Sequence, residues 1–412
     1  MSEPQSDDPT RTGDLLDGVN VALGVTGSVA AVKTVEVAHE LRRHGARVRA
    51  VMTESAAGIV HPWAVGFATD EPVVREITGA VEHVELCGRD GWADVFLVAP
   101  ATANTVGKIA AAIDDTPVTT TATTALGAGV PTVVVPAMHE PMYDHPGVLD
   151  ALDQLESWGV RFVDPRLEEG KAKIATPSAI VTETARVVGD RPLADRHVVV
   201  TAGATSEAID PVRVVTSRAS GKTGRAVARA CYAAGARVTL VHDGPELPWA
   251  DTRQVESAAE MLDATLDAVD ERDGGADTGT DALVSAAAIS DYTVATADEK
   301  IRSGRESLTL ELEPTPKLLD RVGAEHPQLT LVGFKAETSG DDDAMVARAR
   351  ETMRRAGLAF VVGNDASVMG DENTRALIVR GADADEPTTV FSGTKTGLGS
   401  VVAEELSRSF RS

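Results

Sequence analysis

The stretch VNVALGVTGSVAAVKTVEVAHELRRHGARVRAVMT, residues 19–53, contains a strand, a glycine turn, a helix and a second strand in succession. The apolar run VNVALGV leads into Gly-Ser, the next segment has helical periodicity and closes at Gly45, and ARVRAVMT returns as a strand. The same order recurs about 190 residues later, where GARVTLV repeats GARVRAV and Gly235 matches Gly45. We therefore predict two α/β domains, each opening with its own nucleotide-type crevice.

Further apolar segments support parallel sheets in both halves. ADVFLVAPATAN and VPTVVVPAMHEPMY occur in the first half, and DALVSAAAISDY, LTLVGFKAET and LAFVVGND in the second. Strands so continuously apolar are typical of sheets covered by helices on both faces, and polar residues at their carboxyl ends lie where such sheets bind ligands. We place the domain boundary near residue 190, in GDRPLADRH, and expect the acidic residues 1–18 to be disordered.

The charge balance limits the classes of partner. The 412-residue chain has 63 acidic and 39 basic residues, a formal net charge of −24. Such a surface repels nucleic acids and anionic membranes, so we expect neither as a partner. Because the charge is spread along the chain, we interpret it as the halophilic adaptation of a folded protein to a salt-rich cytoplasm. The chain has no 18-residue apolar run, no secretory signal and no CxxC pair, which favours a cytoplasmic protein without a disulfide framework.

Two loops of the first half have the character of phosphate sites. In GVTGSVAAVK (24–33), Gly27 and Ser28 lie where a strand meets a helix, and backbone N–H groups there can bind a phosphate. An ordinary tight turn is the alternative, and the absence of GxGxxG argues against NAD. APATANT (99–105) repeats the arrangement with Thr102, Asn104 and Thr105 as donors, unless it is only a helix N-cap.

Two histidines of the first half are candidates for chemistry. His83, in EHVELCGRDGWAD, could transfer protons near neutral pH, or could be a surface or structural residue. His139 follows a buried strand in VVVPAMHEPMYDHP, where it and Met142 could line a pocket over a flat ring; core packing is the alternative.

The second half contains Gly-Lys-Thr in SRASGKTGRA (217–226), but Thr216 stands where a P-loop requires glycine. The loop is therefore not a P-loop. In SAAAISDYTVATADEKI (285–301), small residues would let a nucleobase approach closely, and Lys300 would suit a triphosphate unless it is only a surface charge. Lysine occurs only nine times in the chain, so each lysine is informative.

Taken together, the ordered motifs resemble the bifunctional phosphopantothenoylcysteine decarboxylase/phosphopantothenate–cysteine ligase family of coenzyme A biosynthesis. GVTGSVAAVK, HVEL, WAD, APATANT and PAMHEPMY are similar to the flavin-dependent cysteine decarboxylase half, a flavodoxin-like fold. TAGATSEAIDPVR, SGKTG, SAAAISDY, EKI, VGFKAET and GNDAS are similar to the ligase half, and the match runs from about residue 19 to 408. The resemblance implies two doubly wound Rossmann-like domains, a decarboxylase over residues 19–190 and a ligase over residues 191–412.

The resemblance also implies cofactors, partners and site residues. The first domain would use FMN to decarboxylate phosphopantothenoylcysteine to 4'-phosphopantetheine, with His83 as catalytic base. The second would join 4'-phosphopantothenate to cysteine with CTP and Mg²⁺ through an acyl-cytidylate, with Lys300 as catalytic residue, and the flavin sites would lie between subunits of a homo-oligomer. The implied FMN residues are Gly27, Ser28, Thr53, Thr102, Asn104 and Thr105, and the implied substrate residues are His139, Met142 and Ser217. The implied CTP residues are Ser285, Ala286, Ala287, Asp291, Lys300, Thr315, Pro316, Lys317 and Phe334.

The chain departs from the family pattern at several positions. His139 and Ser217 stand where many members have asparagine, and the flap EEGKAKIATP (168–177) lacks the cysteine that donates a proton in many members. Lys171, Lys173 or a water would then replace it, or the final reduction would differ from that of those members. Arg354 and Arg355 lie near the place of missing helix lysines, so CTP is expected over ATP as nucleotide donor. The alternative function is that of a non-catalytic flavin-binding regulatory protein. That alternative predicts loss of the histidine and of the ligase domain, whereas His83, Asp291 and Lys300 are all present. The absence of GxGxxG opposes a nicotinamide dehydrogenase.

Overall fold

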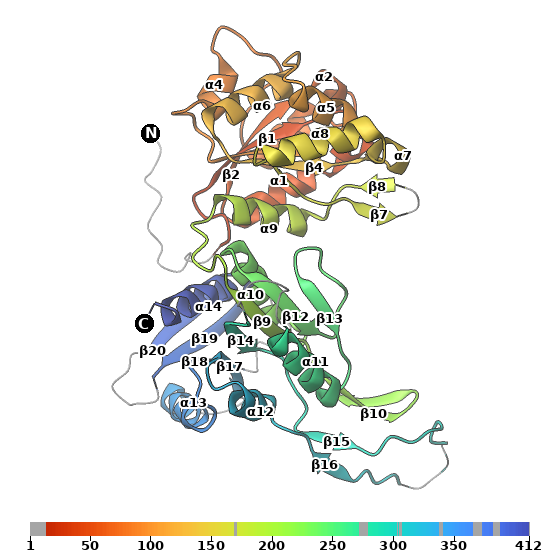
Figure 1. Ribbon diagram of the computed structural model, residues 1–412, viewed down its shortest axis with the longest axis vertical. Helices are drawn as coiled ribbons and strands as arrows, with labels where there is room; N and C mark the ends of the chain where they lie inside the picture. Colours follow the sequence, from red (N-terminus) through yellow and green to blue (C-terminus); the bar gives the residue numbers. More distant parts are fainter. Residues whose placement is uncertain are drawn as a thin grey trace. The chain divides into compact units, whose positions relative to one another are not determined.

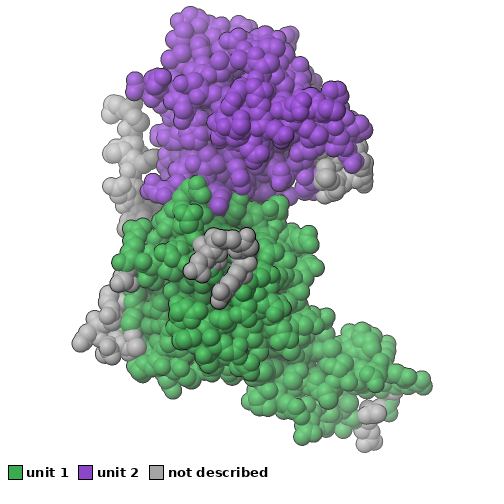
Figure 2. Space-filling model, in the orientation of Figure 1, with its two compact units in different colours: residues 1–13, 191–412 green, residues 14–190 purple. Residues whose placement is uncertain are grey.

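The computed structural model describes residues 14–168, 171–271, 279–302, 304, 307–337, 341–365, 373–381 and 388–411. The chain divides into two compact units, residues 14–190 and the residues from 191 onward (Figure 2). Each unit contains a sheet with helices packed against both of its faces (Figure 1). The prediction of two α/β domains is confirmed. No helix in the described part of the chain has the length and apolar character needed to cross a membrane.

The first unit is built on a five-stranded parallel sheet. Its order is β2 (Arg47–Met52), β1 (Asn20–Val25), β3 (Val95–Ala101), β4 (Thr132–Pro136) and β6 (Arg161–Phe162). This is the flavodoxin-like strand order, in which the chain reverses its direction of progress between β1 and β3. Ligands of such sheets bind outside the carboxyl ends of the strands at that point. The loops after β1 and β3 carry most of the residues predicted to bind FMN.

The helices of the first unit complete both layers. α5 (Ala103–Ala110), α6 (Pro117–Ala128) and α8 (Pro146–Ser157) share one core cluster with the fully buried Phe96 of β3. α1 (Thr34–Arg43) and α9 (Pro177–Val188) pack together, and α9 contacts β3 and β4. The shorter helices are η1 (Val29–Lys33), α2 (Glu54–Ala57), α3 (Pro62–Thr69), α4 (Glu82–Cys87) and α7 (Glu140–Tyr143). A small second sheet has the order β5 (Met138–His139), β8 (Lys171–Lys173) and β7 (Arg166–Glu168).

The second unit has an eight-stranded sheet. Its order is β13 (Asp251–Gln254), β12 (Arg237–His242), β9 (His197–Ala202), β14 (Ala282–Ser285), β17 (Thr330–Glu337), β18 (Phe360–Asp365), β19 (Asn373–Arg380) and β20 (Thr388–Thr394). The first six strands are parallel and, numbered in chain order, follow the Rossmann order 3-2-1-4-5-6. The strand order reverses between β9 and β14. A ligand crevice is therefore expected at the carboxyl ends of these two strands.

An antiparallel hairpin that the sequence analysis did not identify extends this sheet. β19 runs antiparallel to β18, and β20 runs antiparallel to β19. Two reversals restore the direction of β18, so β20 ends at the same sheet edge as the parallel strands. α14 (Lys395–Ser409) begins at that edge and packs against α10 (Lys222–Ala233) on one face of the sheet. α11 (Ala258–Asp270), α12 (Leu318–Glu325) and α13 (Asp342–Ala356) share a core cluster on the other face (Figure 1).

Two short antiparallel ribbons leave the main sheet of the second unit. β10 (Ser206–Asp210) pairs with β11 (Arg213–Thr216), and β15 (Tyr292–Val294) pairs with β16 (Leu312–Pro314). The first ribbon separates the end of β9 from the start of α10. The glycine loop of the ligase half is therefore split in sequence but continuous in space, which explains why no uninterrupted GxGxxG pattern occurs.

The start of the ordered chain differs from the sequence prediction. Residues 14–18, assigned above to a disordered segment, form a turn ahead of β1. Leu16 is fully buried and its N–H donates to the carbonyl of His44 at 3.0 Å. Burial of this one apolar side chain draws the turn onto the first unit. Residues 1–13 lie outside the described residues, as do residues 272–278 of the acidic stretch after α11.

A glycine at the crossing of α10 and α14 gives the first testable prediction. A Cβ placed on Gly399 would lie 2.5 Å from the carbonyl oxygen of Ala226, a backbone atom that cannot rotate away. We therefore expect Gly399→Ala to lower the free energy of unfolding by about 1–3 kcal/mol through overpacking. Gly127→Ala in α6 is the matched control, because nothing lies within 4 Å of its Cβ position. Helix propensity should make that control more stable, by up to about 1 kcal/mol. Denaturant unfolding measures both, and a stabilised Gly399→Ala variant would contradict the close helix crossing.

Candidate functional sites

The loops after β1 and β3 are joined through a threonine that the sequence analysis did not single out. Thr26 is 2 % exposed, its hydroxyl donates to the carbonyl of Pro100 at 2.8 Å, and it accepts from the N–H of Thr102 at 3.1 Å. Thr102 is the N-cap of α5 and accepts from the N–H of Thr105 at 3.2 Å. Thr26 therefore fixes the two predicted phosphate loops against each other at the point where the strand order reverses.

The loop after β4 joins the same sheet edge. Ser28 caps η1 and its hydroxyl donates to the carbonyl of Ala137 at 3.0 Å. The N–H of Ala137 in turn donates to the carbonyl of Ala101 at 2.9 Å. Because Ala137 directly follows β4, this contact links the ends of β1, β3 and β4. His139 lies two residues further on, at the end of β5.

The loop after β2 approaches Gly27 closely. Thr53 is the N-cap of α2, is 7 % exposed, and its hydroxyl lies 3.1 Å from that of Ser55. A Cβ on Gly27 would lie 2.4 Å from the Ser55 hydroxyl oxygen, so a larger residue would push these loops apart. Glycine at position 27 thus lets the ends of β1 and β2 meet. The structure brings together Gly27, Ser28, Thr53, Thr102 and Thr105, with Asn104 exposed on the first turn of α5.

His83 lies on α4, outside these strand-end loops. Its ring is half-buried, and its Nδ1 is buried without a hydrogen-bonding partner among the residues that the structure describes. Buried polar atoms are usually paired, so an unpaired ring nitrogen requires an explanation. It is consistent with a group that acts on a bound molecule, and the ion pair of its neighbour Glu85 with Arg49 holds α4 against β2.

The flap strand lies directly beside His139. β8 pairs antiparallel with β5, and the register places Lys171 opposite His139 and Ala172 opposite Met138. His139 is exposed, and Met142 on α7 is 48 % exposed. The two predicted substrate residues and the cysteine-free flap therefore belong to one small sheet. Glu169 and Gly170, at the tip of the flap, lie outside the described residues.

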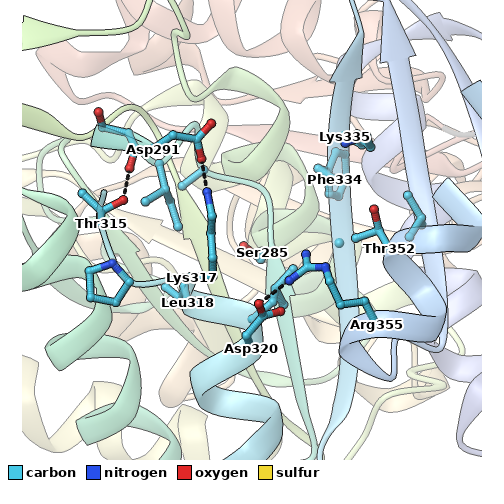
Figure 3. Close-up of a pocket in the computed structure, with 17 residues that line it drawn as sticks. Ser285, Asp291, Thr315, Lys317, Leu318, Asp320, Phe334, Lys335, Thr352 and Arg355 are labelled. Carbon is cyan, nitrogen blue, oxygen red and sulfur yellow. Dashed lines mark hydrogen bonds and ion pairs between the residues drawn. The ribbon is translucent and has the colours of Figure 1, made fainter. Parts of the chain in front are cut away.

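Two adjoining cavities lie at the carboxyl edge of the second sheet. The first, here the Thr315 cavity, has a volume of about 330 Å³ and is shown in Figure 3. Among the residues predicted to bind the nucleotide, it is lined by Ser285, Ala287, Asp291, Thr315, Pro316, Lys317 and Phe334. Lys317 pairs with Asp291, and the Thr315 hydroxyl donates to the carbonyl of Ser290 at 2.5 Å. Leu318, Leu319 and Val361 give this cavity apolar walls, while Arg355 and Asp320 form an ion pair along it.

The second cavity, here the Gly221 cavity, has a volume of about 360 Å³. It is lined by the glycine loop from Ala219 to Gly224, by Gly203 after β9 and by Ala286, Ala287 and Ala288 after β14. It shares Ala287, Ile289, Asp291, Phe334 and Lys335 with the Thr315 cavity. Gly221 has φ of 68°, and a Cβ there would lie 2.8 Å from Gly203, so glycine is required for the two loops to touch. The cavity lies at the reversal point between β9 and β14.

Two predicted residues of the second unit do not line either cavity. Ser217 is exposed, and its hydroxyl accepts from the N–H of Ala219 at 3.3 Å, just ahead of the glycine loop. Lys300 is exposed and precedes Ile301, whose N–H donates to Asp210 at 3.0 Å. Burial alone would raise the pKa of Asp210, but N–H donors from Ile301, Val212 and Arg213 together with the Arg213 guanidinium lower it. Asp210 thus holds the Lys300 segment on the β10–β11 ribbon, and any role of Lys300 in the cavity requires that segment to approach it.

Several cavity residues were not assigned a role from the sequence. Lys222, Lys335 and Lys395 line the Gly221 cavity, and Arg355 and Asp320 line the Thr315 cavity. The scarcity of lysine was the signal, because four of the nine lysines line these two cavities once Lys317 is included. Sequence separation hid the convergence, since Lys222 and Lys395 are 173 positions apart. Among the described residues, no three His, Cys, Asp or Glu side chains are grouped so that they could hold a metal ion.

Comparison with known families assigns each unit separately. Residues 10–189 match the Flavoprotein family model. Residues 193–408 match the model of the DNA/pantothenate metabolism flavoprotein C-terminal domain. The second match alone covers more than half of the chain.

Full-length relatives extend the same result. The chain is 47 % identical over 366 residues to the coenzyme A biosynthesis bifunctional protein CoaBC of Thermococcus kodakarensis, covering 88 % of this chain and 89 % of the relative. It is 34 % identical over 375 residues to CoaBC of Bacillus subtilis, covering 86 % of this chain and 88 % of that relative. A solved C-terminal domain of CoaBC is 26 % identical, with a TM-score of 0.44. The match covers 54 % of this chain and 99 % of the solved domain. A solved PPC decarboxylase mutant complexed with pantothenoylaminoethenethiol is 31 % identical, with a TM-score of 0.36. The match covers 40 % of this chain and 96 % of the solved one. The family models and the full-length relatives confirm the resemblance, and the chain belongs to the family of bifunctional coenzyme A biosynthesis enzymes, in which a flavoprotein decarboxylase domain is joined to a ligase domain.

Proposed function

We propose that this enzyme joins 4'-phosphopantothenate to cysteine at the expense of CTP and then decarboxylates the product to 4'-phosphopantetheine in an FMN-dependent step. The observation that supports it best is the presence of both sites in one chain. Polar loops meet at the strand-order reversal of a flavodoxin-like unit, and a glycine- and lysine-lined cavity lies at the reversal of a Rossmann-like unit. A purely regulatory flavin-binding protein would have no use for the second cavity.

The residues of the first unit fit FMN. N-caps Ser28, Thr53 and Thr102 end adjacent strands, where helix N–H groups favour a phosphate. Glycine at position 27 leaves room that a side chain would fill, and the buried Nδ1 of His83 has no partner among the described residues. We therefore assign Gly27, Ser28, Thr53, Thr102, Asn104 and Thr105 to the FMN.

Bound FMN would supply the two-electron oxidation that makes the cysteinyl carboxylate a good leaving group as CO2. His83 would accept a proton from the substrate as general base. His139 would donate a hydrogen bond to the substrate carboxylate, with Met142 beside it as an apolar contact. The flap strand β8, held against His139 through its pairing with β5, would close over the bound substrate.

The second unit would catalyse acyl activation. The carboxylate of 4'-phosphopantothenate attacks the α-phosphorus of CTP and expels pyrophosphate, which forms an acyl-cytidylate. The amine of cysteine then attacks the acyl carbon, loses a proton and expels CMP as the amide forms. The Thr315 cavity, with its apolar walls of Leu318, Leu319 and Val361, would hold the nucleoside. Asp291 would lie near the ribose and Phe334 beside the base, and the Gly221 cavity would hold phosphates. Mg²⁺ would enter with the nucleotide, and Lys300 would neutralise developing phosphoryl charge.

We also propose a homo-oligomer. Trp63 and Phe67 lie one turn apart on α3 and are 85 % and 81 % exposed, and Val29 on η1 is 80 % exposed. Such side chains are normally covered, and clustered exposed apolar groups are typical of contacts between proteins. Val29 directly follows Ser28, so a second copy covering it would lie beside the proposed FMN site. Light scattering on Trp63→Ser/Phe67→Ser should show a smaller particle than the wild type.

The central test uses one purified preparation in high salt. We expect the protein to be yellow and to convert 4'-phosphopantothenate, cysteine and CTP into phosphopantetheine, CO2, CMP and pyrophosphate. Parallel tubes with CTP and ATP, each followed for pyrophosphate and CO2, determine the nucleotide. Pyrophosphate without CO2 would show that the cysteine-free flap does not support decarboxylation. If neither nucleotide gives either product, the proposed function is wrong.

A further inference from the structure

Two helices begin with the same tripeptide at the Gly221 cavity. Lys222, Thr223 and Gly224 open α10, and Lys395, Thr396 and Gly397 open α14. α10 and α14 pack against each other, and Gly399 lets their backbones come close to contact. Both first lysines line the cavity. The two starts therefore form one surface although the sequence separates them by most of the second unit.

Lys395 stands at a helix position where a cation is unusual. The first turn of a helix carries the positive end of the macrodipole, where cations are destabilising. Lys395 is the first residue of the 15-residue α14 and is only 8 % exposed, which is rare for a lysine. Lys222 opens α10 in the same way. Two helices thus place a cation in their first turn at the same cavity.

The remaining lining strengthens this positive field. Lys335 of β17 is the third lysine of the cavity, and among the residues that the structure describes Asp291 is its one acidic lining residue. In a chain of net charge −24, a cavity lined by three lysines and one aspartate concentrates the opposite sign. Asn364 at the end of β18 adds an amide donor. The lining therefore suits a ligand with more than one phosphate charge.

We propose that Lys395 binds a phosphate group of the ligand in the Gly221 cavity, as a positioning residue contributed by the last helix of the chain. This assignment rests on the proposed function and adds a residue to its second site. β20 delivers Lys395 to the cavity because the β18–β19–β20 reversals bring its end to the same sheet edge. The phosphate belongs either to the nucleoside triphosphate or to 4'-phosphopantothenate, both of which the reaction brings there.

The test compares Lys395→Met, Lys395→Arg and the wild type by calorimetry, with CTP and 4'-phosphopantothenate titrated separately. A charge-assisted hydrogen bond contributes about 1.5–3 kcal/mol, so Lys395→Met should weaken binding of one of the two ligands about 10- to 100-fold. The ligand affected identifies the phosphate that Lys395 holds. Lys395→Arg should recover part of the loss, because it keeps the charge. In steady-state assays the loss should fall mainly on KM for that ligand.

Two controls separate this result from misfolding. Arg411→Met removes a positive charge beyond the end of α14, away from both cavities, and should leave binding unchanged. The first unit is an internal control, because Lys395→Met supplied with phosphopantothenoylcysteine should still release CO2 at the wild-type rate. The thermal midpoint of Lys395→Met, measured beside the titrations, separates lost binding from a lost fold.

The possible failures are distinguishable. If Lys395→Met binds each ligand as tightly as the wild type does and ligation is normal, the assignment of Lys395 is wrong and the proposed function stands. Lys395-dependent binding without product in the wild type would overturn the proposed function and leave the assignment standing. A wild type that binds neither ligand would overturn both.

Discussion

His83→Asn is expected to abolish CO2 release while leaving ligation intact. General-base catalysis contributes about 100- to 10,000-fold, so the decarboxylation rate should fall by at least the lower of these factors. The side chain lies on α4, and its buried Nδ1 has no hydrogen-bonding partner in the described part of the chain. Asparagine occupies a similar volume without accepting a proton near neutral pH. Pyrophosphate release measures the ligase, and CO2 release measures the decarboxylase, in the same reaction.

His39→Asn is the matched control for this experiment. His39 is also a half-buried histidine on a helix of the first unit, but it lies on α1. It should retain both activities. The flavin absorbance of His83→Asn should equal that of the wild type, which separates a lost base from a lost cofactor. Decarboxylation near the wild-type rate in a yellow His83→Asn variant would show that His83 is not the base.

Arg380→Met is expected to lower the free energy of unfolding of the second unit by about 3 kcal/mol, because it leaves a buried carboxylate without its main partner. Arg380 on β19 donates to Glu405 on α14 at 2.6 and 2.5 Å. The Glu405 side chain is 6 % exposed and that of Arg380 is 25 % exposed. Denaturant unfolding measures the loss. Arg408 also contacts Glu405 but is largely exposed and cannot replace the bidentate pair.

The effect should depend on pH in a defined direction. Hydrogen bonds from Arg380 lower the pKa of Glu405 below its ordinary value of 4.5 by more than burial raises it. A carboxyl group with a lowered pKa stabilises the fold above its unfolded pKa and loses that contribution as pH falls through the folded pKa. The difference in the free energy of unfolding between wild type and Arg380→Met should therefore be largest at neutral pH. It should decrease below pH 4.5.

Arg375→Met provides the control on the same strand. Arg375 forms an equally close pair with Asp342, but both side chains are about half exposed. Exposed pairs contribute little to stability, so this variant should unfold much closer to the wild type. The double variant Arg380→Met/Glu405→Leu should recover much of the loss, since it leaves no buried charge. A full loss in the double variant would show that packing, not charge, holds β19 to α14.

Local patterns were sufficient to predict the central parallel strands of both units, but not the parallel edge strands β6 and β13. The predicted strand, helix and strand of residues 19–53 correspond to β1, α1 and β2, with Gly45 at φ of 93° just past the helix. The later apolar runs correspond to β3, β4, β14, β17 and β18. These strands are buried on both faces, so their sequences are continuously apolar and stand out. The half-exposed strands β10, β11, β15 and β16 lack that pattern and were missed.

The sequence by itself determined the fold class, the order of the motifs and hence the family, because most of the motifs lie at the ends of buried strands that hydrophobicity alone identifies. Only the tertiary structure decided which of these motifs meet. It joined Thr26 to Pro100 and Thr102, split the glycine loop around the β10–β11 ribbon, and left Lys300 outside both cavities. It also brought Lys395 to Lys222 across 173 positions. That contact depends on strand order, on two antiparallel reversals and on a close helix crossing, and none of these leaves a periodic signal in the residues themselves.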